Sequence, residues 1–144
     1  MHRLPIFAIC LALTAISHAS KEPSLEELIA RANAAPPKEQ AGLYIEIAER
    51  ELKSADELYV AGKVEEARKS VANVVTYSEK AHDAAIQTGK KLKSVEMSVR
   101  KMSHKLNDVK RTLNFEDQPP VAEASNQLER LADDLLTTMF GKTK

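Results

Sequence analysis

Mostly apolar positions from Val64 to Leu113 recur at spacings that alternate between three and four residues; Ser78 and Thr88 are the polar members, and no step of the pattern is missed. Such a pattern is a heptad seam, which predicts one long helix or two collinear helices packed along a single stripe. Gly89 lies within this stretch without shifting the register, and a glycine inside a helix costs only about 1 kcal/mol relative to alanine. We therefore predict one continuous central helix at about 64–113.

Capping residues and prolines predict three shorter helices beside the central one. Ser24 and Glu27 match a capping box, in which each side chain accepts a hydrogen bond from the other residue's backbone amide. The pairs Pro36–Pro37 and Pro119–Pro120 suit the first turn of a helix, where the missing amide would have no intrahelical partner. The shorter helices are predicted at about 24–33, 38–61 and 119–140.

Glycines and the lack of a strand pattern complete the prediction of the fold class. Gly62 and Gly141 suit helix C-termini, where the backbone turns into a left-handed conformation. No alternating run of β-branched residues bounded by turns occurs in the sequence. The chain is therefore predicted to be all-α, an antiparallel helical bundle of coiled-coil hairpins around one long central helix.

The predicted helix lengths constrain how these helices pair. The central helix would be roughly 75 Å long, and the helices before and after it roughly 35 Å each. The two flanking helices would then run antiparallel to the central helix and meet near Gly89, each covering one half. Because a thin coil of this kind leaves apolar edges open, we expect a homodimer or a bound protein partner.

The first 19 residues have the layout of a secretory signal peptide. His2 and Arg3 precede an apolar run from Leu4 to Ile16, and small residues at Ser17 and Ala19 suit cleavage after position 19. The apolar run is too short to span a membrane, which takes about 20 residues. We predict a signal peptide at 1–19, a single helical domain at 20–144 with no transmembrane span after signal removal, and a periplasmic or secreted protein.

Composition excludes several classes of protein. The 144 residues are 43% hydrophobic and 29% charged, which is enough apolar material for one folded domain. Lys plus Arg and Asp plus Glu each number 21, so no overall positive charge points to nucleic acid as a partner. The single cysteine excludes a disulfide scaffold and a four-cysteine zinc module.

The sequence also lacks the usual signs of catalysis. His82 and His104 lie 22 residues apart, outside any HExxH or HxxxH spacing, and we expect both to be solvated on helix surfaces. Adjacent acidic residues such as Glu65 and Glu66 point apart on a helix, and the glycines form no phosphate-binding loop. We expect no catalytic residue, no metal site and no cofactor, and therefore a protein that is not an enzyme.

Charge is unevenly distributed along the second half of the chain. The segment 89–111 has eight basic residues against two acidic ones, whereas the segment 115–134 has six acidic residues and one arginine. The two segments are expected to be antiparallel neighbours, so the main interpretation is that they neutralise each other. The alternative is an outward basic surface for an anionic component of the cell envelope, formed by Lys93, Arg100, Lys101 and Arg111.

One stretch resembles a known repeat family. The run Ala55-Asp-Glu-Leu-Tyr-Val-Ala-Gly-Lys-Val-Glu-Glu-Ala67, continued by Val71 and Val74, is similar to the centre of a tetratricopeptide repeat. The resemblance implies a tight helical hairpin over residues 55–74. The pattern departs from the family at Glu79, where the repeat has a proline, and no second copy follows at a 34-residue offset. The chain also resembles small exported helical proteins of bacteria, which implies no function.

Taken together, the sequence predicts an exported, non-enzymatic helical protein that acts in protein–protein interaction or as a scaffold. The alternative is a binder of lipid headgroups or of an anionic polymer through the basic face of residues 89–111. A carrier of a small molecule or metal is less well supported, because the helical seam contains modest side chains and no internal polar cluster.

Overall fold

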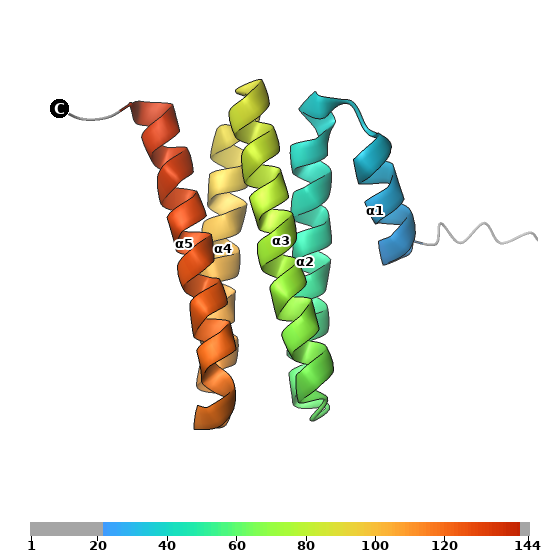
Figure 1. Ribbon diagram of the computed structural model, residues 1–144, viewed down its shortest axis with the longest axis vertical. Coiled ribbons are helices and arrows are strands. Elements are labelled where there is room, and N and C mark those ends of the chain that lie inside the picture. Colours follow the sequence, from blue (N-terminus) through green and yellow to red (C-terminus); the bar gives the residue numbers. More distant parts are fainter. Residues whose placement is uncertain (1–21, 142–144) are drawn as a thin grey trace, which may run out of the picture.

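A computed structural model describes residues 22–141, and this part of the chain is all-α, as predicted (Figure 1). The predicted signal peptide at 1–19 lies outside the described residues. No helix within 22–141 is both long and apolar enough to cross a membrane. The elements are α1 (Leu25–Ala34), α2 (Pro37–Val60), α3 (Val64–Thr88), α4 (Leu92–Arg111), a 3-10 turn η1 (Phe115–Asp117) and α5 (Gln118–Phe140).

The helix ends follow the predicted capping chemistry. Glu27 donates its backbone N–H to the Ser24 hydroxyl over 3.1 Å, and Ser24 donates its own N–H to the Glu27 carboxylate over 3.2 Å. Prolines occupy the first turns of α2 and α5, as expected for residues that lack an amide hydrogen. Gly62 follows α2 with φ of 77°, so it supplies the left-handed residue that reverses the chain into α3.

The prediction of one continuous helix over 64–113 is wrong, because the chain breaks at Gly89. Helix α3 ends at Thr88, and Gly89 has φ of 67° and ψ of 11°, a left-handed conformation that a continuing α-helix excludes. The Gly89 N–H donates to the carbonyl of Ala85 over 2.8 Å, and Lys90 N–H donates to the Thr88 hydroxyl over 3.2 Å. The heptad seam continues across the break because both helices present an apolar stripe to the same core.

The break places two helical hairpins side by side in the same orientation. Helix α2 packs antiparallel on α3, and α4 packs antiparallel on α5, so the predicted pairing partners are correct. The hairpins then meet through α3 with α5 and α2 with α4, and these pairs run parallel. Contacts between them join residues about 50 positions apart, such as Arg68 with Asp117 and His82 with Asp134. In Figure 1, α3 and α5 lie in front of α2 and α4, which gives two layers.

This arrangement covers the seam within one chain. Leu106 and Val109 of α4 are buried together with Val121 and Leu128 of α5, and none is more than 3% exposed. The expectation of a homodimer rested on a thin two-helix coil with open apolar flanks. Because the two hairpins cover each other, that physical reason no longer holds.

Helix α1 closes the stack on the side of α2. Its apolar residues Leu28 and Ala32 are buried, and its two ends are held by side chains of α2. Arg50 donates to the carbonyl of Pro23 over 2.5 Å just before α1 begins, and Gln40 donates to the carbonyl of Ala32 over 3.2 Å at its far end. The short helix is therefore fixed at both ends and runs in the same direction as α3 and α5 (Figure 1).

Candidate interaction surfaces

The four cations predicted to form an outward basic surface lie in different surroundings. Arg100 donates to Glu96 over 2.6 Å and to Asp133 of α5 over 3.1 Å, and these hydrogen bonds raise the pKa of Arg100 above its ordinary value. Arg111 lies 3.4 Å from Asp108. These two arginines are therefore neutralised within the chain, Arg100 partly across the α4–α5 hairpin as the main interpretation of the charge pattern expected.

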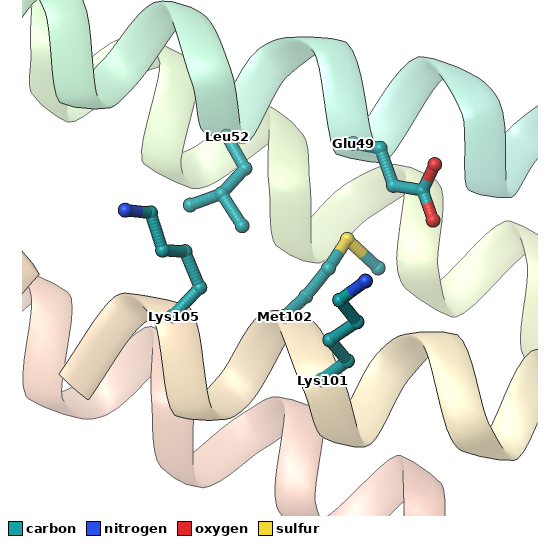
Figure 2. A pocket seen from close by; sticks show the side chains of 5 residues that line it. All are labelled: Glu49, Leu52, Lys101, Met102 and Lys105. Atoms are coloured by element: carbon teal, nitrogen blue, oxygen red, sulfur yellow. The ribbon is translucent and has the colours of Figure 1, made fainter. Parts of the chain in front are cut away.

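Lys101 lies in a different place, on the rim of a hollow between α2 and α4. Leu52 of α2 and Met102 of α4 form the apolar floor, with Glu49 on the opposite rim (Figure 2). Lys105 borders the same hollow and lies 3.4 Å from Asp56 of α2. The hollow has a volume of ≈ 200 Å³, and its lining contains neither a thiol, a hydroxyl nor an imidazole that could act as a nucleophile or metal ligand.

Lys93, the fourth cation, belongs to a basic end of the stack that sequence reasoning did not identify. The start of α2 and the turn between α3 and α4 lie together there, and Lys38, Glu39, Lys90 and Lys91 line a shallow hollow of ≈ 360 Å³. Lys93 is exposed in the first turn of α4, immediately after this turn.

The backbone conformation of Lys91 and a glycine of α2 determine where the Lys91 side chain lies at this end. Its φ of 60° places it in the left-handed region, which is uncommon for a residue with a side chain. A Cβ at Gly42 of α2 would lie 3.1 Å from the Lys91 ammonium nitrogen. The lysine side chain therefore lies across α2 where Gly42 leaves space for it.

In addition to these two hollows, a groove runs between α3 and α5. Val71, Ala72 and Val75 line it from α3, and Pro120 and Ala124 line it from α5. Its volume is ≈ 400 Å³, and the lining residues of α3 cover positions 68–79, which is about 17 Å or three helical turns. The charged and polar residues along it are Arg68, Thr76, Glu79, Glu123 and Gln127.

His82 is not the solvated surface histidine that the sequence predicted. Its side chain is 14% exposed and bridges two carboxylates, with Nε2 2.6 Å from Asp134 of α5 and Nδ1 2.9 Å from the neighbouring Asp83. Burial by itself lowers the pKa of His82, but the hydrogen bonds and charges of the two carboxylates outweigh it, so the pKa is raised above its usual value. His82 therefore joins α3 to α5 most strongly when it is protonated.

The described residues contain no group of three or more His, Cys, Asp and Glu side chains arranged to hold a metal ion.

Two buried serines form the clearest internal polar contact. The hydroxyls of Ser103 and Ser125 lie 2.9 Å apart, and each donates to the other residue's carbonyl over 3.1 Å. This pair satisfies its own polar groups between α4 and α5, so it is structural.

Comparison with protein-family models, with curated proteins and with solved structures finds no match to this chain. The resemblance of residues 55–74 to a tetratricopeptide repeat therefore stays a prediction.

Proposed function

We propose that the protein is an exported, non-enzymatic interaction protein that binds an amphipathic helix of a partner protein in the groove between α3 and α5. The observation that carries this proposal is the length and lining of the groove. Val71, Ala72 and Val75 of α3 lie along the same groove as Pro120 and Ala124 of the parallel helix α5, so both helices contribute apolar side chains to it. Small residues such as Ala72 and Ala124 allow a third helix to approach closely, which is the geometry of helix-in-groove recognition.

Charge along the groove restricts the partner further. Glu79 is exposed at one end of the groove, and Arg68 lies at the other end. Arg68 is already paired with Glu65 and Asp117, as Glu123 is with Arg130. A helix with a small apolar stripe and a basic residue opposite Glu79 would match this pattern. Such complementarity acts mainly on the choice and orientation of the partner, and less on the total affinity.

The proposal is tested by photo-crosslinking from inside and outside the groove. A photoreactive residue at Ala72, which lines the groove, is expected to give a discrete crosslinked product in envelope extracts. The same residue at Asn73, which is exposed on α3 outside the groove, is the matched control. Thr76→Arg should abolish the Ala72 product, because an arginine there fills the groove. Identical products from both positions, or a product insensitive to Thr76→Arg, would refute the docking of a partner in the groove.

The alternative, an anionic partner on the outer face of α4, has less support than the charge count suggested. Arg100, Lys105 and Arg111 each lie within 3.4 Å of a carboxylate of the same chain. Their charges are therefore largely compensated before any partner arrives. Three other lysines of the same segment, Lys90, Lys91 and Lys93, lie at one end of the stack instead.

A further inference from the structure

Charge in this electrically neutral chain is separated along the helix axes. The end that contains the start of α2 and the turn between α3 and α4 has five basic residues and one acidic residue, a net charge of +4. The basic residues are Arg31, Lys38, Lys90, Lys91 and Lys93, and the acidic residue is Glu39.

The opposite end has the reverse sign. It consists of the turn between α2 and α3 and the connection between α4 and α5, over residues 57–66 and 108–117. These two segments have six acidic and three basic residues, a net charge of −3. A negatively charged surface would therefore attract the first end and repel the second, which orients the stack with its helices upright on that surface.

An exposed aromatic side chain lies at the basic end. Helix α5 finishes there with Phe140, which is 79% exposed and is followed by Gly141 with φ of 72° (Figure 1). Exposed apolar side chains also occur at the acidic end, where Phe115 is 85% exposed, but Glu116 and Asp117 follow it directly. Of the two ends of the stack within residues 22–141, the basic end therefore combines a net positive charge with an exposed aromatic ring, and the acidic end does not.

We propose that the basic end of the stack, formed by Lys38, Lys90, Lys91, Lys93 and Phe140, docks on the surface of an anionic lipid bilayer. Lysines near such a surface are attracted by its negative potential, and an aromatic side chain beside them enters the boundary between headgroups and acyl chains. A soluble polyanion would engage the lysines but would offer no apolar phase to Phe140, so the pair of features favours a bilayer. This inference does not depend on the groove between α3 and α5.

The experiment is cosedimentation of the chain beginning at residue 20 with vesicles of phosphatidylcholine alone and of equimolar phosphatidylcholine and phosphatidylglycerol. Binding is expected only to the anionic vesicles and should weaken as salt is added. The triple variant Lys38→Gln, Lys90→Gln, Lys93→Gln is expected to lower the binding constant on the order of 100-fold, since each lysine near the surface contributes about a factor of five.

A matched control variant distinguishes an effect of the basic end from an effect of the net charge of the protein. The variant Lys53→Gln, Lys63→Gln, Lys69→Gln removes the same charge from exposed positions elsewhere and should leave the binding constant within about threefold of the original, because these lysines lie away from the docking end. All six positions are exposed, so neither triple variant removes a buried contact.

Two aromatic variants test the bilayer itself. Phe140→Ala is expected to lower the binding constant about tenfold and Phe115→Ala to leave it unchanged. Lack of binding to anionic vesicles, or an equal loss in both triple variants, would overturn the proposal. If the triple variant that includes Lys38→Gln binds anionic vesicles more weakly but Phe140→Ala binds them as before, the proposal is also overturned. The basic end would then recognise charge alone, as expected for a soluble polyanion. Ala72→Arg in the groove should not change vesicle binding, so this proposal and the proposed function fail independently.

Discussion

Gly89→Ala is expected to lower the free energy of unfolding by about 1 kcal/mol. At φ of 67° the backbone of Gly89 is left-handed, and an L-residue in this region costs roughly 1–2 kcal/mol. A Cβ added at Gly89 would meet nothing within 4 Å, so the cost comes from the backbone and not from a clash. A continuous helix through Gly89 would give the opposite sign, a gain of about 0.5–1 kcal/mol from the better helix former.

Urea unfolding followed by far-UV circular dichroism measures this difference, with an unchanged denaturant slope as the sign that only stability has changed. Gly42→Ala is the matched control, because Gly42 lies inside α2 and its new Cβ would meet only the end of the Lys91 side chain, with the ammonium nitrogen 3.1 Å away. It should be neutral or stabilise by up to about 1 kcal/mol. Gly89→Asn should cost less than Gly89→Ala, since asparagine tolerates the left-handed region. If Gly89→Ala stabilises the protein as Gly42→Ala does, the break between α3 and α4 is wrong.

Three further predictions concern single contacts and the N-terminus. Because the pKa of His82 is raised in the folded state, its contribution to stability is fully present below the unfolded pKa and is lost as the pH rises through the folded pKa. Urea unfolding across that pH range should show the free energy of unfolding declining by at most about 1 kcal/mol, and Asp134→Asn should reduce this decline; a decline unchanged by Asp134→Asn would refute the bridge. Ser125→Ala is expected to cost about 1 kcal/mol in thermal unfolding, since the hydrogen bond from the buried Ser125 hydroxyl to the Ser103 carbonyl is lost, and a double-mutant cycle with Ser103→Ala should show coupling between the two. Intact mass of the exported protein should correspond to cleavage after Ala19, and a product that retains the first 19 residues would contradict the predicted localisation.

Local chemistry determined the helices of this protein. The capping box at Ser24, the proline pairs and Gly62 lie at helix ends in the structure, and the boundaries they predict are correct to within a few residues. These signals are readable from the sequence because each acts within one or two turns of backbone. The heptad seam also identified the buried face of each helix, since apolar periodicity reflects burial whichever partner provides it.

The break at Gly89 was decided by tertiary structure. Helix propensity alone tolerates one glycine within a helix, and the heptad seam passes Gly89 without a change of register. No local signal therefore distinguished a continuous helix from a turn. The turn prevails because folding the second hairpin beside the first buries apolar surface on both, which outweighs the cost of ending one helix and starting another. Lys91 accepts a left-handed backbone in this turn, which no sequence pattern indicated.

The candidate surfaces depend on that turn. Lys38 precedes Lys90 by 52 positions, and the bridge between His82 and Asp134 joins residues 52 positions apart, so neither could be found by reading charge along one segment. The sequence determined how many charges the chain has and which helix each belongs to. Only the stacking of the two hairpins brought together pairs such as Arg68 and Asp117 and placed Lys38 beside Lys90 at one end, because ion pairing and charge clustering depend on separation in space.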